Sequence, residues 1–344
     1  MNESLDIEPP SVGMQSSAPM ERASALPFPT LEVSDAVLLP AESLEDRFER
    51  LRAECRAEVE AGRLEEALAR AEEAVEIAER LGDGARAELA RCNRGAVAIA
   101  LGCFDDVADL RAILMRNREA STSFAAAYNL AHAYELRREF KKSLFYARIA
   151  RDRAECSGDR EFLAKSWNQI GLGLTGDSWF EEGLKACDRA LELLDRSGAD
   201  AELCTVSALA RVNRAYCLVV LGERDEAFRD LFRCLRWYRR RGVHIGEVHP
   251  HLILCYAYLE LGRLCRAWRH GCRALRLAEA TGERQAQRHA HFLLAEIEKT
   301  AGDYDAAQRH LDRLWELTPD TAGRPTAPPA AAVVGLAQVV NLRA

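Results

Sequence analysis

The sequence predicts an all-α protein, a solenoid of seven helical pairs, from two interleaved series of turn residues. The first series marks the turn inside each pair, with spacings of 40, 36, 40, 44, 40 and 40 residues: Gly62, Gly102, Arg138, Ser178, Gly222, Gly262 and Gly302. The second series marks the far end of each second helix, where glycine can adopt a left-handed conformation: Gly82, Gly158, Gly198, Gly242 and Gly282. Two interleaved series that share one period indicate a structural repeat.

Residues 163–193 show the repeating unit most clearly, as two amphipathic helices joined by a tight turn at 176–178. Apolar or small residues share one face of each helix: Trp167, Ile170, Gly171 and Leu174 on the first, and Phe180, Gly183, Cys187 and Ala190 on the second. We expect Gly171 and Gly183 to allow close approach of the two backbones, with Trp167 and Phe180 filling the space beside them.

The other turns are followed by the same pattern. An aromatic or leucine side chain usually stands two residues after the turn: Leu64, Phe104, Phe140, Phe180, Leu264 and Tyr304, with Arg224 as the exception. Three residues further on the side chain is mostly small: Ala67, Val107, Ser143, Gly183, Ala227, Ala267 and Ala307. These positions predict where each second helix begins and which of its faces is buried.

This pattern resembles the tetratricopeptide repeat (TPR), whose signature is Trp-x2-Leu-Gly-x2-Tyr followed by Ala-x3-Phe-x2-Ala. The resemblance covers residues 44–317 and points to the long-repeat variant, because the period of about 40 exceeds the usual 34 residues. The chain departs from the signature at Glu54-Cys55, at Arg91 and at Arg138. The resemblance implies a right-handed superhelix whose first helices line a concave groove, and a function in binding proteins or peptides.

Two segments flank the predicted solenoid. Residues 1–43 are rich in Ser, Pro, Glu and Ala, and we expect them to lack fixed structure. Residues 318–344 begin as a Pro- and Ala-rich linker and end in the apolar run AVVGLAQVVNLRA. We hypothesise that this tail occupies the C-terminal end of the groove until a partner displaces it. Deletion of residues 325–344 should then raise the affinity for that partner.

Composition limits the class of protein. The N-terminus has no apolar signal-peptide core and no stretch is long enough to span a membrane, so the expected location is the cytoplasm. Eleven cysteines without any CxxC pair suit a reduced protein with buried thiols. The net charge of −7 argues against a general nucleic-acid coat. The oligomeric state is left open.

The candidate binding residues come from alignment of the repeats on their turns. Side-chain amides recur in four consecutive repeats at one position: Asn93, Asn129, Gln169 and Asn213. Further groove-facing positions carry Tyr128, His132, Lys165, Asn168, Leu172, Tyr216, Tyr256 and Phe292. Such amides can hold the backbone of an extended peptide, beside tyrosines that anchor its side chains. In peptide-binding TPR proteins the Asn has that role, which the resemblance carries to Asn93, Asn129 and Asn213. The alternative is that these amides only bond to neighbouring backbone.

Two arginine-rich runs, 231–241 and 263–276, fall on second helices, each with five arginines and no acid. The candidate basic patch comprises Arg233, Arg236, Arg240, Arg266, Arg269, Arg273 and Arg276. One interpretation is a solvated outer face; the other is a surface for RNA or an acidic partner. Trp237, Tyr238 and Trp268 nearby are interpreted as filling space between helices.

No catalytic motif or cofactor site is expected. His249 and His251 recur one period later as His289 and His291, and imidazoles at that density could hold zinc. Residues two apart on a helix point in different directions, however, so neither pair is expected to chelate a metal as a unit. The chain contains no HExxH, GxSxG or glycine-rich phosphate loop. We therefore expect a non-enzymatic scaffold without metal or cofactor.

Overall fold

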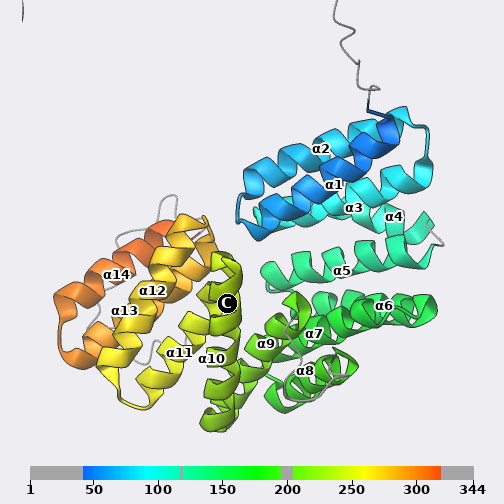
Figure 1. The fold of residues 1–344 in the computed structure, drawn as a ribbon. Coiled ribbons are helices and arrows are strands. Elements are labelled where there is room, and N and C mark those ends of the chain that lie inside the picture. Colours follow the sequence, from blue (N-terminus) through cyan, green and yellow to red (C-terminus); the bar gives the residue numbers. More distant parts are fainter. Residues whose placement is uncertain (1–41, 117–118, 195–203, 319–344) are drawn as a thin grey trace, which may run out of the picture. The chain divides into compact units, whose positions relative to one another are not determined.

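The computed structural model describes residues 42–116, 119–194 and 204–318. Within them, helices follow one another in seven pairs (Figure 1). The first helices are α1 (Leu44–Glu60), α3 (Gly84–Ala100), α5 (Ala120–Leu136), α7 (Arg160–Gly176), α9 (Thr205–Leu221), α11 (Val248–Glu260) and α13 (Arg284–Ala301). The second helices are α2 (Leu64–Arg80), α4 (Val107–Arg116), α6 (Phe140–Ser157), α8 (Phe180–Leu194), α10 (Arg224–Arg241), α12 (Leu264–Ala280) and α14 (Tyr304–Leu317). A short 3-10 helix, η1 (His244–Glu247), precedes α11. The predicted fold class is confirmed.

The turn positions predicted from the period all adopt the left-handed conformation, including the two that are not glycine. Arg138 has φ 62° and Ser178 has φ 67°, beside values such as 78° at Gly62. The residue after each turn donates its N–H to the carbonyl five residues earlier, as Glu139 does to Tyr134 at 2.8 Å. This bond completes a Schellman cap in all seven turns, so the turn geometry depends on position in the repeat rather than on glycine itself.

The long period reflects long helices. A pair such as α5 and α6 contains helices of 17 and 18 residues, joined by a three-residue turn. Several first helices begin at a side-chain cap, because Asp83 and Asp159 each accept hydrogen bonds from two backbone N–H groups of the following turn. Helix α4 is the exception, with only 10 residues, and it packs more extensively on α5 than on its own partner α3.

The two helices of a pair have different neighbours. Each first helix from α3 to α11 contacts the first helix of the next pair, and we call the succession from α3 to α13 the first-helix row. Within the described part of the chain, no two successive second helices share a comparable contact. First helices therefore lie closer to one another than second helices do, which agrees with their predicted position on the inner side of a solenoid.

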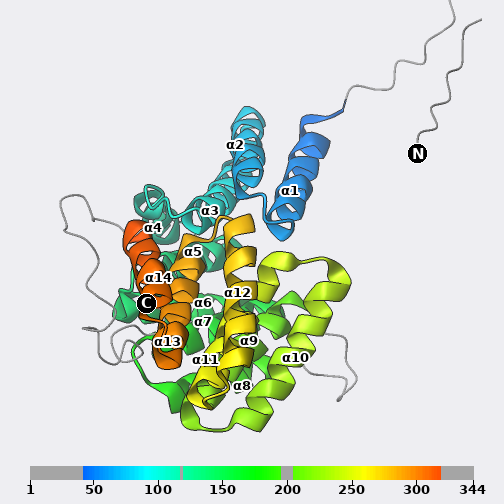
Figure 2. The ribbon, with the colours of Figure 1, turned by 90° about the vertical axis from the view of Figure 1, so that its left-hand side faces the viewer.

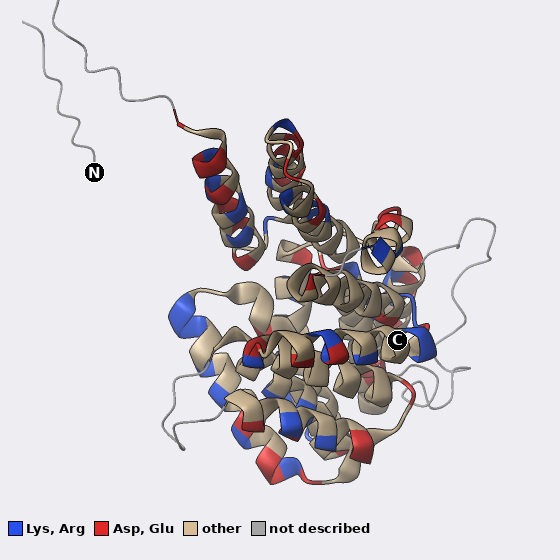
Figure 3. Ribbon diagram, turned by 90° about the vertical axis from the view of Figure 1, so that its right-hand side faces the viewer, with Lys and Arg blue, Asp and Glu red and all other residues tan. Residues whose placement is uncertain are grey.

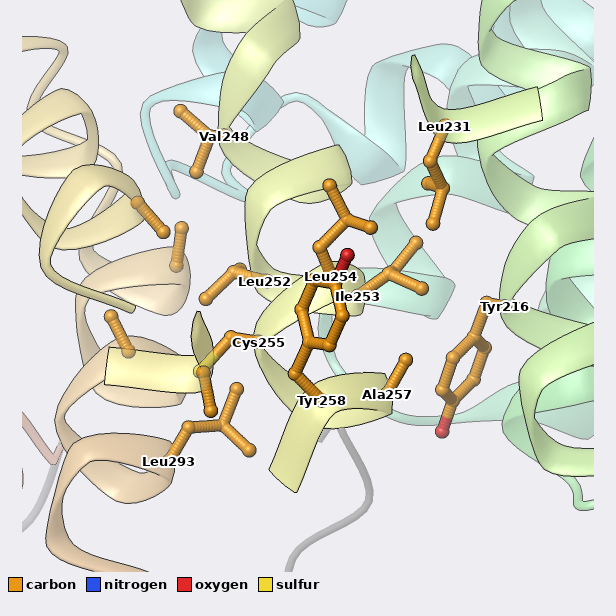
Figure 4. Close-up of a cluster of buried hydrophobic side chains, with 14 of the residues drawn as sticks. Tyr216, Leu231, Val248, Leu252, Ile253, Leu254, Cys255, Ala257, Tyr258 and Leu293 are labelled. Atoms are coloured by element: carbon orange, nitrogen blue, oxygen red, sulfur yellow. The ribbon is translucent and has the colours of Figure 1, made fainter. Parts of the chain in front are cut away.

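The largest hydrophobic cluster lies around α11, which is apolar on nearly all sides. In Figure 4, Ile253 of α11 lies on the side of Leu231 of α10, and Cys255 lies on the side of Leu293 of α13; all four side chains are buried. A helix that is hydrophobic all round is stable only when it is covered on every side. Figure 2 shows α11 largely enclosed by its neighbours, which accounts for its unusual sequence.

The predicted close approach inside the fourth pair is confirmed. A β-carbon at Gly171 would lie 3.2 Å from the carbonyl oxygen of Gly183, and one at Gly183 would lie 3.3 Å from that of Gly171. Trp167 packs beside this contact against buried residues of pairs three and four. Small residues at both positions are therefore needed for the two helices to pack at this distance.

Several sequence-based predictions concern other parts of the chain. The N-terminal segment up to residue 41, the turn residue Gly198 and the apolar C-terminal tail all lie outside the described residues. None of the helices in the described part combines the length and the apolar character needed to cross a bilayer.

Candidate functional site

The recurring amides connect neighbouring helices of the first-helix row. The Nδ2 group of Asn129 on α5 donates to the carbonyl of Cys92 on α3 at 2.7 Å. The Nδ2 group of Asn213 on α9 donates to Oδ1 of Asn168 on α7 at 2.8 Å. Gln169 is only 1% exposed. Asn129 thus bonds to the backbone of a neighbouring first helix, as in the alternative considered for such amides, whereas Asn168 and Asn213 bond to each other through their side chains.

The place of these amides in the repeat explains why they lie between first helices. In pairs six and seven the same position carries Ile253 and Leu293, and both side chains are buried in the core. In pair two it carries Asn93, whose side chain is half-buried. The position therefore lies where adjacent first helices meet, and Asn93 and Asn213 are the amides there that retain access to solvent.

A partly accessible polar cluster on the first-helix row lies on α5. Tyr128, His132 and Glu135 are spaced by four and three residues and share one face of that helix. His132 Nδ1 lies 3.2 Å from Glu135 Oε2, and the His132 side chain is half-exposed. Burial and the nearby Glu135 carboxylate raise the pKa of Tyr128 to about 12, so its phenol stays protonated and can donate a hydrogen bond.

Aromatic rings connect this cluster to α7; Phe124 is buried, and Phe162 and Tyr128 are half-buried. The rings of Phe124 and Phe162 stack at 4.2 Å, and Tyr128 stacks on Phe124 at 5.6 Å. Lys165 Nζ lies 5.7 Å from the centre of the Phe162 ring and pairs with Glu161 at 2.7 Å. An aromatic surface bordered by a base and an acid can hold both the apolar and the polar groups of a peptide.

The two remaining predicted tyrosines differ in accessibility. Tyr216 is only 5% exposed, and its ring meets the edge of Phe180 at 6.0 Å, so it belongs mainly to the core. Tyr256 is half-buried, and burial, together with the Glu260 carboxylate, raises the pKa of its phenol. Of the two, Tyr256 has the more accessible side chain.

The predicted basic patch falls on α10 and α12, both second helices, which are in view in Figure 2. Five of its members are exposed: Arg236, Arg240, Arg266, Arg269 and Arg276. Arg233 and Arg273 are half-buried. The Arg266 guanidinium lies 5.6 Å from the centre of the Tyr258 ring. On the face shown in Figure 3, by contrast, basic and acidic residues are interspersed.

The aromatic residues near this patch differ from one another. Tyr238 is buried and Trp237 is half-buried, as expected for side chains that fill space between helices. The indole of Trp268 is largely exposed and donates to Glu298 Oε1 at 2.9 Å.

One buried ion cluster was not predicted. Arg214 of α9 bonds to Asp188 of α8 at 2.6 Å, to Asp230 of α10 at 2.7 Å and to Glu226 of α10. Arg211 also reaches Asp230, at 3.1 Å. Burial alone would lower the pKa of the Arg214 guanidinium, but its three carboxylate partners raise it. Because these groups satisfy one another, the cluster connects three helices rather than presenting a free charge to a ligand.

The histidines proposed as an alternative zinc site lie apart. His249 Nε2 pairs with Glu283 Oε1 at 2.9 Å, whereas His251 Nδ1 lies 2.8 Å from His270 Nδ1. The two imidazoles thus face different neighbours, as their spacing on a helix predicts. Among the residues that the structure describes, no three His, Cys, Asp or Glu side chains are arranged to hold a metal ion.

Shallow surface hollows lie at the turn ends of some pairs, away from the first-helix positions discussed above. One, of about 380 Å³, is lined by residues 178–182 and Leu221. Another, of about 460 Å³, is lined by residues 301–305. Neither of these hollows includes a predicted binding residue.

Sequence reasoning overlooked Glu135 and Phe162 as part of the α5–α7 surface. Glu135 carries a detectable signal, because the corresponding position in the neighbouring pairs is apolar or uncharged, as at Ile99 and Thr175. An acid at a position of this kind needs a partner, which here includes His132. Phe162 carries no such signal, because one aromatic residue near a helix start is not distinctive.

Comparison with known proteins identifies the fold but not a family. A scan of protein-family models finds no match to the chain, and neither does a sequence search of curated proteins. Among solved structures, the chain is similar to a Rap protein complexed with Competence and Sporulation Factor. The TM-score is 0.63 at 15% identity, over 80% of this chain and 76% of that one.

Two further solved structures align with lower scores. The apo form of RapI gives a TM-score of 0.49 at 13% identity, over 80% of this chain and 77% of that one. BtubC (BKLC) from P. vanneervenii gives a TM-score of 0.48 at 17% identity, over 71% of this chain and 97% of that one. We base the comparison of fold on the Rap complex. It shows that the chain has the TPR-like arrangement of helical pairs found in that Rap protein.

Proposed function

We propose that the chain is a non-catalytic scaffold that binds an extended peptide or protein segment along the first-helix row, as an adaptor or a regulatory sensor. The observation that carries this proposal is the surface of α5 and α7. His132 and Lys165 are partly exposed there and Tyr128 is half-buried, next to stacked aromatic rings. Rigid rings beside hydrogen-bonding groups are typical of surfaces that bind peptides.

The fold comparison supports the same proposal. The Rap structure similar to this chain is a complex with Competence and Sporulation Factor. We transfer from it only the idea that this arrangement of helical pairs can hold a partner. The residues that would do so here are Asn93, Tyr128, His132, Lys165 and Tyr256, because each retains access to solvent on a first helix.

A displayed library of random peptides, selected against the purified full chain, tests this proposal. The inner variant combines Asn93→Ala, Lys165→Ala and Tyr256→Phe, which remove polar groups without opening a large cavity. The matched outer variant combines Lys141→Ala and Lys185→Ala on the exposed faces of α6 and α8. Selected peptides should lose at least tenfold in affinity for the inner variant and keep their affinity for the outer one.

Two results would contradict the proposal. Affinity for the inner variant equal to that of the parent chain, with unchanged circular dichroism, would show that binding does not depend on these first-helix residues. Failure of the parent chain to select any peptide, while a known peptide-binding control succeeds, would favour a structural spacer.

The arginines of α10 and α12 support a second candidate function, the binding of RNA or an acidic protein. Arg236, Arg240, Arg269 and Arg276 are exposed, and none of them forms an ion pair with a carboxylate in the part of the chain that the structure describes. Four phosphate contacts to single-stranded RNA would give a slope of about −3 in a plot of log affinity against log salt. A peptide held mainly by rings and hydrogen bonds should show a much smaller slope.

A further inference from the structure

Four histidines form two matched pairs in the last two helical pairs. His251 Nδ1 on α11 lies 2.8 Å from His270 Nδ1 on α12, and His291 Nδ1 on α13 lies 2.9 Å from His310 Nδ1 on α14. The partners are 19 residues apart in both cases, and the second pair follows the first by one 40-residue period. His251 is 4% exposed and His291 is 8% exposed. Each contact thus connects the first and second helix of one repeat in a largely buried place.

A hydrogen bond between two Nδ1 atoms requires one ring that carries a proton there and one that does not. Two neutral imidazoles of opposite tautomer satisfy this requirement. When both rings are protonated, two N–H groups face each other and the bond is lost. A pair of this kind is therefore stable with two or three protons in total and is disrupted by the fourth.

Arg239 fixes the tautomers of the first pair. Its Nη2 lies 3.3 Å from His251 Nε2, and its Nε donates to Glu247 Oε2 at 2.9 Å. Because a guanidinium only donates, His251 Nε2 must accept, which places the His251 proton on Nδ1 and makes His270 Nδ1 the acceptor. A third proton would break either the bond to Arg239 or the bond between the two imidazoles.

The charged groups around the first pair also oppose protonation. Burial, His270 and Arg239 lower the pKa of His251 to about 3, with Arg273 of α12 acting in the same direction and only Glu247 of η1 opposing it. Burial and Arg239 likewise lower the pKa of His270. The Glu247 carboxylate is itself shared with Arg239 and with His244 of η1, 3.0 Å away.

The second pair has no guanidinium bonded to its imidazoles in the described structure, whereas Arg239 bonds to the first pair. Burial, His310 and Arg313 of α14 lower the pKa of His291 to about 4, against the influence of Glu316. Burial and Arg309 lower the pKa of His310, and Glu298 of α13 opposes them. The second pair should therefore take up its first proton at a higher pH than the first pair.

We propose that these two histidine pairs make the packing of the last two helical pairs sensitive to pH, holding α11 to α12 and α13 to α14 at neutral pH and releasing them in acid. A free histidine has a pKa near 6.5, so an opened pair binds protons that the closed pair excludes. Opening therefore becomes easier as the pH falls below about 6.5. Above that pH the pairs contribute their full stabilisation.

The variant H270N/H310N tests this inference in the full chain. The Asn Oδ1 atom occupies the place of Nδ1 and can accept the same hydrogen bond, but it does not titrate. The variant His132→Asn, on α5, is the matched control. Hydrogen exchange of α11–α14 is compared with that of α6–α8, which contain no histidine, in the same sample; this cancels the intrinsic effect of pH on exchange.

The expected effect follows from proton linkage. Between pH 7.5 and 5.5, each histidine that is neutral when closed and charged when open raises the opening constant about tenfold. The variant replaces one histidine in each pair, so the pH-dependent change in protection should fall about tenfold where one pair opens by itself and about a hundredfold where both pairs open together. The His132→Asn control should retain the pH dependence of the parent chain.

Three outcomes would overturn the inference. The first is an unchanged pH dependence in folded H270N/H310N. The second is the observation, in ¹⁵N spectra of the parent chain, of charged imidazoles in both pairs at pH 5.5, which would refute the proposed neutral state. This measurement does not depend on whether the variant folds. The third is a change in the Nδ1 signals on addition of Zn²⁺ at pH 7.5, which would reassign the pairs as metal ligands.

Discussion

Substitution of Gly171 by alanine tests the packing inside the fourth helical pair. A β-carbon at this position would lie 2.8 Å from Cys187 Sγ and 3.2 Å from the Gly183 carbonyl oxygen. Cys187 is completely buried, and the carbonyl belongs to the backbone of α8. Neither neighbour is the free end of a flexible side chain, so α7 and α8 must move apart to accept the methyl group.

The expected cost follows from two opposing effects. Alanine is favoured over glycine in a helix by about 1 kcal/mol. Overpacking of a dense core costs about 1–3 kcal/mol, and the contact with backbone places Gly171→Ala near the upper value. The net result should be a loss of about 2 kcal/mol in the free energy of unfolding.

Gly95 provides the matched control, because it occupies the same repeat position in the second pair. A β-carbon there would meet only Leu110, at 3.3 Å from Cδ1 of a side chain that can shift. The gain in helix propensity and the smaller packing cost should nearly cancel. Gly95→Ala should therefore change the free energy of unfolding by less than about 0.5 kcal/mol.

Urea denaturation followed by circular dichroism at 222 nm measures both variants. With an m-value of about 3 kcal/mol/M, the midpoint of Gly171→Ala should fall by about 0.7 M, and that of Gly95→Ala should stay near that of the parent. If Gly171→Ala were as stable as the parent chain, the close approach of α7 and α8 would not limit packing, and the reasoning would be refuted.

Three further predictions concern the ion cluster, a turn and the thiols. Arg214→Leu should cost about 3 kcal/mol at pH 7 in urea denaturation, because it leaves the buried Asp230 carboxylate without its main partner; a loss below about 1 kcal/mol would contradict this. Arg138→Gly should raise the free energy of unfolding by about 0.5–1 kcal/mol, since φ 62° is unfavourable for arginine, and destabilisation would argue against that strain. Ellman's reagent at pH 8 should modify the exposed Cys103 quickly but reach Cys92, whose pKa burial raises to about 12, only after unfolding; equal rates at the two thiols would contradict the structure.

The architecture was largely predictable from the sequence, because the residue pattern that each helical pair needs for packing recurs in several repeats. Arg138 and Ser178 show this most clearly. Neither residue favours a left-handed turn, yet their place in the period predicted the turn, and both have positive φ. The close contact of Gly171 with Gly183 was predictable for the same reason, since small residues face each other across the two helices.

The roles of the candidate binding residues were less predictable, because the role of a polar side chain depends on a neighbour that the sequence does not identify. Asn129 finds its acceptor on the preceding first helix, 37 residues earlier in the chain, at the carbonyl of Cys92. Every residue has a backbone carbonyl, so the sequence does not show which one accepts the hydrogen bond. Alignment therefore located the repeated position correctly but did not distinguish Asn129, which is bonded between helices, from Asn93, which retains access to solvent.

The histidine pairs illustrate the same difficulty in another form. Recurrence after 40 residues drew attention to His249 and His251, but the partner of His251 is His270, on the following helix. The spacing of 19 recurs at His291 and His310, so the signal was present. This spacing can be interpreted only when the helix lengths are known, because they place the two imidazoles opposite each other within one helical pair.

The most direct test of the central claim is photo-crosslinking from two positions of the fourth helical pair. Leu172 on α7 is half-exposed on the predicted inner side, and Lys185 on α8 is exposed. Each is replaced in turn by p-benzoylphenylalanine, and the full chain is irradiated with a peptide selected from the library. The proposed function predicts a covalent adduct from position 172 and none from position 185. An adduct from position 185 alone would place the partner on the second helices and contradict binding along the first-helix row.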